Sequence, residues 1–483
     1  MPETAFAAYP RQILRDEAGK PVRELLWGDF VSVLGVAGDK LKVRSRGSDG
    51  FLTPAQVQDS RLLEVNFVDI GQGDGTFLVM PDDRKMVIDA GEADNMFRFL
   101  SWRFNLRASP DREVKIDDVV ISHPDMDHYK GFTPIFGSEQ FAFGTVYHNG
   151  IVEQIGANTT LGTKTGKFLT SVVPDRTALR QITTDPARTG SKLYPNLLKK
   201  LDESGRSGDI RMISASDGFL PGYEADKEVS IRVLGPVLSP SGGQPAYKWF
   251  EDPGKTKNGH SVVLRLTIGS VSILLGGDLN IPAERHLLEH YTGLGIEASN
   301  EETLVQAARQ TFQVDIAKAC HHGSADFSTS YLRAVNALAT VISSGDAESH
   351  AHPRPDALGA FGKYSRGVRP LIFSTELARS SKDKIKHPQA LRDEIQKLQE
   401  RIDVADGAEK AALQEKFTKL LATIERSVSV YGMITLRTDG TKVLMAQRLE
   451  ERRVGPSSVA DFDTYQLEPD HNGVLQYTSK HEE

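Results

Sequence analysis

Four side chains of kinds that bind metal ions lie within six residues of one another, at His123, Asp125, Asp127 and His128. They follow the β-branched run Val119–Ile121, which is typical of a buried strand. Alternate positions on a tight loop let the first histidine and the first aspartate converge on one point, while the adjacent Asp-His pair turns toward a second. The segment could therefore hold two metal ions; the alternative is a solvated polar turn in which the aspartates cap the backbone.

Read as a motif, the loop resembles the H-x-H-x-D-H loop of the metallo-β-lactamase superfamily, with Asp125 in place of the second histidine. This variant is typical of the branch that resembles the hydrolase domain of the competence protein ComEC. Five further segments are similar to that branch and occur in its order: Val68–Asp74, Met86–Gly91, Leu274–Asp278, Cys320–Ser324 and Ile342–Pro353. The resemblance spans about residues 65–353 and implies the α/β class, in the form of an αββα metallo-β-lactamase sandwich.

The same resemblance implies roles for individual residues. Asp278 follows two glycines at the end of a predicted strand, where a carboxylate can bridge two metals, as it does in the superfamily. Of the two histidines that follow the strand predicted at Asp315–Ala319, we expect His321 to complete the second metal site. The predicted metal ligands are His123, Asp125, Asp127, His128, Asp278 and His321. The predicted catalytic residues are Asp127, His322 beside the substrate, and His352 as a phosphate contact or proton donor to the leaving group.

Two further polar residues are expected to support the site. His260 precedes the predicted strand Val262–Leu266, where a typical metallo-β-lactamase carries a third histidine of the first metal site. Because the ComEC-like branch usually lacks a histidine ligand there, we predict a supporting role for His260, with metal ligation as the alternative. Asp74, in the glycine-rich turn at residues 71–75, is expected to hydrogen-bond the metal loop. That turn lacks the spacing and the following helix of a nucleotide-binding fold, so we exclude one.

The predicted ligands indicate hydrolysis. Two divalent ions would activate a water molecule for attack on an electrophile whose oxygen they polarise. Three of the six ligands are aspartates, so Mn²⁺ or Zn²⁺ is expected, with Mg²⁺ as an alternative. Such a site suits phosphoryl oxygens and the resemblance implies a DNA nuclease, so we predict a phosphodiesterase acting on nucleic acid, with DNA favoured. The alternatives are a small-molecule phosphodiesterase or phosphocholine-esterase-like hydrolase and, in another class, a non-catalytic interaction protein.

Composition indicates a soluble globular protein, since 39% of the 483 residues are hydrophobic and 25% are charged. A net charge of −7 gives no overall electrostatic footprint for nucleic acid, but it leaves room for a local basic groove. Basic residues gather around one Gly/Ser-rich loop, at Lys199, Lys200, Arg206 and Arg211. The single cysteine, Cys320, excludes a disulfide within the chain and favours a reducing, cytoplasmic location. No apolar run is long enough to span a bilayer, so no membrane partner is expected.

The chain divides into regions of different pattern. In order, the predicted regions are a β module at 1–62, a hydrolase domain at 63–383 with a loop insertion at about 150–225, a helical hairpin at 384–427, a closing β-hairpin at 428–454 and a flexible tail at 455–483. Short strand-like pieces broken by Gly and Asp turns make the β module resemble a bacterial SH3-like barrel. The helical hairpin could dimerise the protein, clamp a substrate or cap the domain, so a protein partner or a homodimer through either appendage is a further hypothesis.

Overall fold

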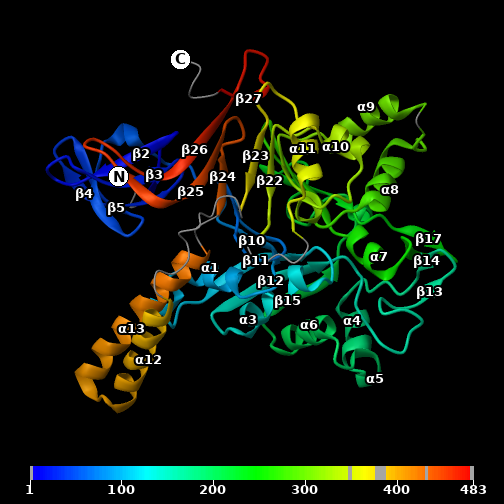
Figure 1. Cartoon of the computed structure of the whole chain (residues 1–483), viewed down its shortest axis with the longest axis horizontal. Coiled ribbons are helices and arrows are strands. Elements are labelled where there is room, and N and C mark those ends of the chain that lie inside the picture. The colour runs from blue at the N-terminus through cyan, green and yellow to red at the C-terminus, as the bar shows by residue number, and fades with distance from the viewer. Residues whose placement is uncertain (1–3, 298, 346–350, 376–387, 430–432, 479–483) are drawn as a thin grey trace.

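The computed structural model describes residues 4–297, 299–345, 351–375, 388–429 and 433–478, and only the backbone of residues 388–393, 422–429, 450 and 451. Its class is mixed α/β, as the sequence predicts. Two sheets stack face to face, and helices cover their outer faces (Figure 1). The junction predicted at residues 383 and 384, and residues 346–350 of the motif that ends at Pro353, lie outside the described residues.

The larger sheet has the strand order β15-β12-β11-β10-β9-β8-β24-β25-β26-β27. Its strands are β8 (Leu63–Phe67), β9 (Gly75–Val79), β10 (Lys85–Ala90), β11 (Val114–Ile121), β12 (Phe141–His148), β15 (Ser207–Met212), β24 (Ile434–Thr438), β25 (Val443–Val454), β26 (Val459–Pro469) and β27 (Leu475–Tyr477). Neighbours among β10, β11, β12 and β15 run parallel. Their carboxyl ends therefore share one edge of the sheet, which is where side chains that follow a strand can meet.

The second sheet has the strand order β16-β19-β20-β21-β22-β23. Its strands are β16 (Val229–Gly235), β19 (Val263–Ile268), β20 (Val271–Leu275), β21 (Ile316–Lys318), β22 (Ala339–Ile342) and β23 (Leu371–Ser374). Neighbours from β20 to β23 run parallel. The segments after β20 and β21 carry Asp278 and the histidine pair, so both sheets present their strand ends to the same place.

Alternating side chains explain how each sheet is covered on both faces. Met86 and Ile88 of β10 enter the core between the sheets, whereas Val87 packs against helices on the outer face. In the second sheet Ile273 points inward and Leu274 outward. Successive side chains of a strand point to opposite faces, so strands covered on both sides need apolar residues at every position. Each such side chain contributes about 1.5–3 kcal/mol when it leaves water completely.

Helices form the two outer layers. On the larger sheet lie α1 (Asn95–Arg103), α2 (Met126–Tyr129), α3 (Phe132–Gly137), α4 (Arg176–Thr183), α5 (Pro186–Thr189) and α6 (Leu193–Glu203). Near the second sheet lie α7 (Pro253–Gly259), α8 (Ile281–Thr292), α9 (Glu301–Phe312), α10 (Thr329–Val335) and α11 (Pro355–Tyr364). A small sheet joins β13 (Lys164–Thr165), β14 (Phe168–Leu169), β18 (Gln244–Lys248) and β17 (Ser239–Ser241).

The region predicted as a loop insertion at about 150–225 is more regular than expected. Leu197, Leu198 and Leu201 of α6 are buried in the core outside the larger sheet. The following strand, β15, is an edge strand of that sheet. The helix was not predicted because lysines stand between the leucines of α6 in the sequence. These lysines extend toward solvent, so the apolar face of the helix is hard to recognise from the sequence alone.

An N-terminal sheet with the order β3-β2-β6-β5-β4-β1-β7 precedes the two stacked sheets. Its strands are β1 (Thr4–Ala7), β2 (Arg11–Arg15), β3 (Pro21–Leu26), β4 (Phe30–Ala37), β5 (Lys40–Ser45), β6 (Ser48–Leu52) and β7 (Val57–Gln58). It is joined to the larger sheet by a cluster that includes Trp27 and Phe462. Arg437 of β24 is buried at this joint, 2.8 Å from an oxygen of Asp29 and 3.2 Å from an oxygen of Glu64.

The C-terminal part contains a helical hairpin and additional strands. α12 (Pro388–Val404) and α13 (Gly407–Ser429) form an arm that projects from the body, and α13 packs on α1 (Figure 1). The tail predicted to be flexible after residue 455 instead forms β26 and β27. Phe462 and Leu467 of β26 are buried, and the antiparallel ladder with β25 holds the strand in register. The polar residues that suggested a loose tail are those on its less buried face.

Among the described residues, we find no helix that combines the length and the apolar character needed to cross a lipid bilayer.

Candidate metal centre

The metal loop lies at the edge where the parallel strands end. β11 ends at Ile121, and the chain turns through His123 into the short helix α2. Asp125 is the N-cap of that helix, and its side chain accepts a hydrogen bond from Met126 N at 3.2 Å. The cap fixes where the helix starts and thereby directs His128 back toward the strand ends.

Four side chains face one another at this edge: Asp127, His128, Asp278 and His322. The Nε2 atoms of His128 and His322 each lie 3.3 Å from an oxygen of Asp278. The same Nε2 atoms lie 3.9 Å and 3.5 Å from the two oxygens of Asp127. Two imidazoles and two carboxylates that face each other in this way form a four-ligand set of the kind that holds a divalent cation.

Unsatisfied buried atoms show that a cation fits this set. His128 Nε2, His322 Nε2 and Asp278 Oδ1 are buried and make no hydrogen bond within the described part of the chain. Buried polar atoms are almost always hydrogen-bonded, because leaving one unpaired costs about 1–3 kcal/mol. A divalent ion would satisfy all three atoms at once.

Asp89, which the sequence analysis did not single out, supports His128 from behind. One oxygen of Asp89 lies 2.8 Å from His128 Nδ1, and the other accepts a hydrogen bond from Ser122 N at 2.8 Å. A carboxylate on Nδ1 fixes the ring so that Nε2 faces the ion. The signal in the sequence was an aspartate two residues before glycine near the end of a strand; Asp89 has a φ of 55° there.

The glycine-rich turn brings a second supporting carboxylate into the centre. Asp74 Oδ1 lies 3.1 Å from His322 Nδ1, and its other oxygen forms an ion pair with the buried Lys318. Asp74 N donates a hydrogen bond to Asp127 O at 3.2 Å, which ties this turn to the metal loop. Gly73 permits the close approach, because a Cβ at this position would lie 1.6 Å from Asp127 O.

Charge in the centre is distributed unevenly among the histidines. Burial disfavours the protonated forms of His128 and His322, but nearby carboxylates, Asp278 above all, outweigh it and raise the pKa of both imidazoles. In contrast, burial and the neighbouring His128 hold the pKa of His123 well below its usual value. Burial raises the pKa of Asp278, but the histidines around it prevail and keep that pKa well below its usual value.

The predicted ligand His321 lies beside the four-ligand set, and His322 lies in it. His321 Nε2 is 3.9 Å from the nearer oxygen of Asp278, and its side chain is 25% exposed. Both histidines have left-handed backbone, with φ of 50° and 53°, so the turn sends their side chains in different directions. The ring of His352 is centred 5.7 Å from that of His321 and 6.2 Å from that of His322, at the border of the centre.

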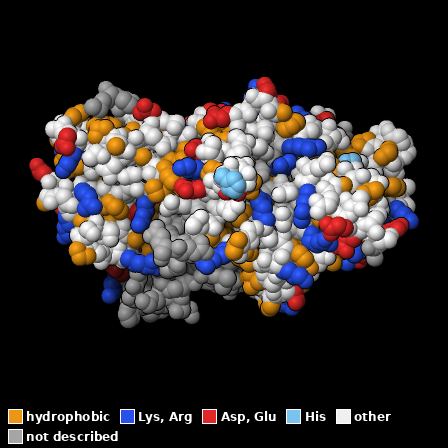
Figure 2. All heavy atoms as spheres, turned by 90° about the horizontal axis from the view of Figure 1, so that it is seen from above, with side chains coloured by type: hydrophobic (Ala, Val, Ile, Leu, Met, Phe, Trp, Pro, Cys, Tyr) orange, Lys and Arg blue, Asp and Glu red, His pale blue; other side chains and the backbone are white. Residues whose placement is uncertain are grey.

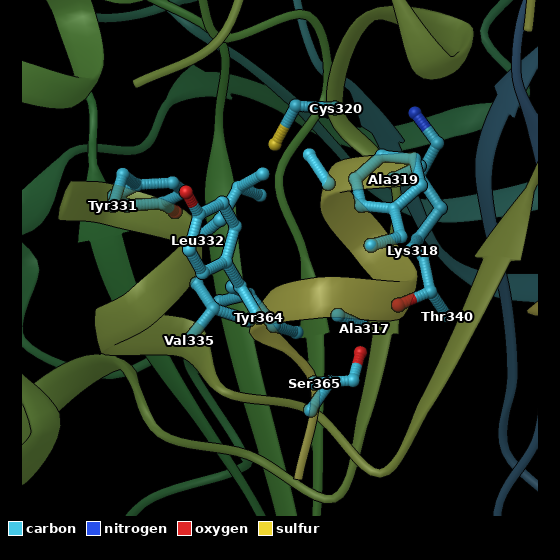
Figure 3. Close-up of a pocket in the computed structure, with 14 residues that line it drawn as sticks. Ala317, Lys318, Ala319, Cys320, Tyr331, Leu332, Val335, Thr340, Tyr364 and Ser365 are labelled. Carbon is cyan, nitrogen blue, oxygen red and sulfur yellow. The ribbon is translucent and has the colours of Figure 1, made fainter. Parts of the chain in front are cut away.

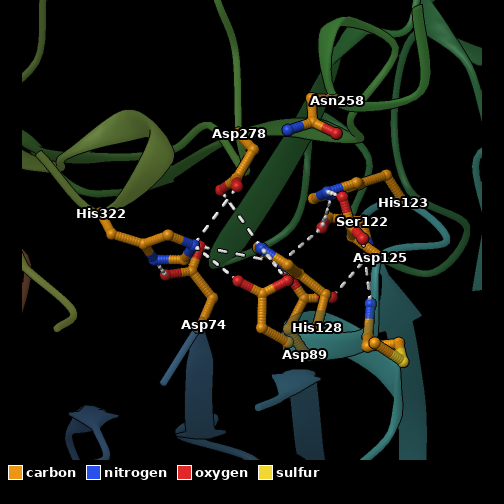
Figure 4. Close-up of polar contacts among 12 residues, drawn as sticks. Asp74, Asp89, Ser122, His123, Asp125, His128, Asn258, Asp278 and His322 are labelled. Atoms are coloured by element: carbon orange, nitrogen blue, oxygen red, sulfur yellow. Dashed lines mark hydrogen bonds and ion pairs between the residues drawn. The ribbon is translucent and has the colours of Figure 1, made fainter. Parts of the chain in front are cut away.

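His123 and Asp125 occupy the other side of His128 (Figure 4). His123 Nε2 belongs to a group with His128 and Asp278 that could hold a metal, whereas Asp125 belongs to none found among the described residues. Asp125 Oδ2 lies 3.9 Å from His123 Nε2, and Asp125 Oδ1 accepts a hydrogen bond from Lys257 Nζ at 3.0 Å. The two sides of the centre therefore differ in how their carboxylates are used.

His260 is turned away from the centre. Its Nε2 lies 2.7 Å from Lys248 O, and its ring stacks between Tyr247 and Phe250 at centroid distances of 4.4 Å and 4.7 Å. Burial lowers its pKa to about 3, which keeps the ring neutral. His260 thus contacts residues around the centre and not the four converging side chains. Ser261, the next residue, lies with its Oγ 3.2 Å from His123 Nδ1.

A cavity behind the centre is distinct from it. It lies between the second sheet and helices α10 and α11, and most of its lining is apolar (Figure 3). Lys318 and Cys320 border it, and none of the converging histidines and aspartates does. Burial raises the pKa of the Cys320 thiol far above its usual value, so this cysteine is a neutral packing residue.

Comparisons with known proteins add little to this description. No protein-family model matches the sequence, and no curated protein matches it. One solved structure that is similar is named "Putative metal-dependent hydrolase", from Parabacteroides distasonis ATCC 8503. The match covers 76% of this chain and 98% of that one, with 10% identity and a TM-score of 0.27. A likeness this slight carries no argument, so function has to be argued from the side chains.

Proposed function

We propose that this protein is a metal-dependent hydrolase that cleaves phosphodiester bonds in nucleic acid, with DNA as the favoured substrate. The observation that carries the proposal is the meeting of Asp127, His128, Asp278 and His322 at distances of 3.3–3.9 Å, with buried atoms of His128, His322 and Asp278 that make no hydrogen bond within the described part of the chain. An interaction protein without catalysis has no need of such a cluster, which costs stability unless an ion is bound.

The proposed fold is a metallo-β-lactamase-like sandwich with a ComEC-like metal loop. Its support is the packing order of helices, sheet, sheet and helices, together with ligands that come from strand ends of both sheets. We further propose that the N-terminal sheet is an SH3-like module, which its short antiparallel strands and separate apolar core support.

The residues of the centre divide the work. A bound divalent cation would lower the pKa of a water molecule and polarise the oxygen of the substrate. Asp89 holds His128 by Nδ1, and Asp74 Oδ1 lies 3.1 Å from His322 Nδ1, so carboxylates stand behind both rings whose Nε2 atoms are directed at the centre. Burial opposes ionisation of Asp127, but His322 and His128 outweigh it and lower its pKa, so its carboxylate stays ionised and can hold the cation or orient a water molecule.

Substrate selection follows from the carboxylates and the border residues. Aspartates make the centre suitable for hard ions such as Mn²⁺ and Mg²⁺ as well as Zn²⁺, and such ions suit phosphoryl oxygens. His321 and His352, at the border, are placed to contact a phosphate or to protonate the leaving oxygen. The centre thus favours a phosphodiester over an amide or thioester substrate.

The test is cleavage of single- and double-stranded DNA and RNA by the purified protein, with Mn²⁺, Mg²⁺ or Zn²⁺ supplied in turn. We expect Asp127→Asn and His128→Ala to lose about 10³-fold or more of the activity, because each removes a ligand whose ion provides several kcal/mol. His471→Ala, an exposed histidine between β26 and β27, is the matched control and keeps full activity. Equal cleavage by all of these variants would dismiss the proposal.

A small phosphodiester is the second candidate substrate. The net charge is −7, and on the face seen in Figure 2 basic and acidic side chains are interspersed. Long nucleic acids usually bind through a continuous basic surface, whereas a small substrate needs only the centre itself. Faster turnover of bis(4-nitrophenyl) phosphate than of DNA, with no inhibition by added DNA, would favour this candidate.

A further inference from the structure

The two carboxylates of the metal loop have different partners. Asp127 faces His128 and His322, and no protein ammonium or guanidinium is paired with it among the described ion pairs. Asp125 is two residues away and is held by protein donors on both oxygens. Oδ1 accepts from Lys257 Nζ at 3.0 Å and from Met126 N at 3.2 Å. With its amide nitrogen turned toward the loop, Asn258 donates to Oδ2 at 3.1 Å.

Lys257 is built into this position. It lies on α7, whose N-cap is Asp252, and the Asp252 side chain accepts a hydrogen bond from Lys255 N at 2.9 Å. Only 17% of the Lys257 side chain is exposed. A buried stem and a capped helix hold the ammonium next to the metal loop, unlike a surface lysine, which samples many rotamers.

The position beside Lys257 is short of ligands. The group that could hold a metal there consists of His123, His128 and Asp278. His128 Nε2 already belongs to the four-ligand set, and Asp125 is engaged by Lys257, so His123 and the shared carboxylate of Asp278 are the protein ligands left for a second ion. Catalytic zinc sites use three protein ligands, and carboxylates are the ones that attract a second cation most strongly. An ammonium next to the same point also repels a divalent ion.

We propose that this centre holds one divalent cation, bound by Asp127, His128, Asp278 and His322, and that the Lys257 ammonium takes the position of a second cation beside Asp125. This inference rests on the proposed function, because it assumes that the four-ligand set binds metal. It departs from the two-ion arrangement expected from the sequence. The positive charge that a second ion would present to a substrate phosphate is then supplied by a side chain that cannot be removed by chelators.

The test is the metal content of the full chain after equilibration with excess Mn²⁺ and gel filtration, measured by elemental analysis. We expect about one ion per chain in the wild type and about two in Lys257→Met, which keeps the length of the side chain but removes its charge. Lys257→Arg keeps the charge and is expected to stay near one. Lys255→Met is the matched control on the same helix, and it also stays near one.

A second variant keeps the test decisive if Lys257→Met is poorly folded. Asp125→Ala is expected to leave the content near one ion per chain, whereas in a two-ion centre it would remove a ligand and lower the content from about two. Electron paramagnetic resonance gives an independent reading, since a lone Mn²⁺ and an exchange-coupled pair have different spectra. Two tightly bound ions in the wild type, or one ion in a folded Lys257→Met, would overturn the inference and leave the proposed function standing. No bound metal in any variant would overturn the proposed function itself.

Discussion

The two sides of His128 use the same kinds of side chain for different purposes. On one side Asp127, Asp278 and His322 face each other with few protein donors between them. On the other side the carboxylate of Asp125 is neutralised by Lys257. Asp278 and Asp127 are the more buried carboxylates, with 4% and 21% of the side chain exposed against 33% for Asp125, and a buried carboxylate is tolerated only when something positive compensates it. The comparison teaches that the identity of that positive partner, and not the presence of an aspartate, marks where an ion binds.

The largest contrast is expected between Asp278→Asn and Asp125→Asn. Asp278 is shared by both histidines of the four-ligand set, so its loss should abolish metal binding and lower hydrolysis by about 10³-fold. Asp125→Asn keeps a hydrogen-bonding side chain outside that set and should cost about tenfold or less. Rates with Mn²⁺ and metal content of both variants check this. Similar losses for the two would erase the distinction between the sides.

A second contrast separates the adjacent histidines. His322→Ala removes a ligand and should weaken metal binding by more than the roughly 10–100-fold that loss of a supporting residue costs. His321→Ala should leave metal affinity nearly unchanged and act on the hydrolytic rate alone. Isothermal titration with Mn²⁺ measures both affinities. If His321→Ala lost the metal and His322→Ala retained it, the geometry of the turn would be misassigned.

Supporting contacts should have a smaller effect. Asp89→Asn keeps the shape of the side chain but weakens its hold on His128 Nδ1, so we expect metal affinity to fall by roughly 10–100-fold. The fold should persist, because Asn can still accept the hydrogen bond from Ser122 N. Metal titration combined with circular dichroism separates loss of affinity from loss of structure. An unchanged affinity would show that Asp89 does not orient the ligand.

The smallest expected effect is a pH dependence of metal affinity, which arises from His128 and His322 and not from His123. Burial opposes protonation of His128 and His322, but the surrounding carboxylates outweigh it and raise both pKa values, which favours the protonated rings in the metal-free protein. Binding the ion must displace protons from these rings, and affinity should therefore increase as the pH rises. His123, whose pKa is lowered, releases none. Calorimetry in buffers of different protonation enthalpy counts the protons, and a count near zero would contradict this charge distribution.

Much of the centre could be read from the sequence because it is local. Asp127 and His128 are adjacent in one loop, and Asp278 directly follows a glycine pair after a β-strand. Strand ends gather at one edge of a parallel sheet, so such residues meet whatever the details of the fold. The mixed α/β class follows from the same alternation of apolar strands and amphipathic helices.

What could not be read depends on backbone direction and on distant pairing. Residue types do not tell which of His321 and His322 faces the ion, because the left-handed turn that decides it is not visible in the motif. A lysine at the end of a strand, Lys318, suggests exposure, yet it is buried against Asp74, which is 244 positions earlier. Lys257 is likewise 132 positions from its partner Asp125. Long-range partners of this kind leave no local periodicity.

The buried Arg437 bears on what the N-terminal sheet can do. Its guanidinium is shared between Asp29 of that sheet and Glu64 of β8, so cutting the chain after residue 62 would remove one anion and uncover Phe462. Breaking a buried ion pair costs about 3–5 kcal/mol, a large fraction of the stability of an ordinary domain. The N-terminal sheet is therefore a structural part of the protein body rather than an independent appendage, and both parts should melt in a single cooperative transition. A ligand bound to the N-terminal sheet would therefore have a fixed position and orientation relative to the two stacked sheets.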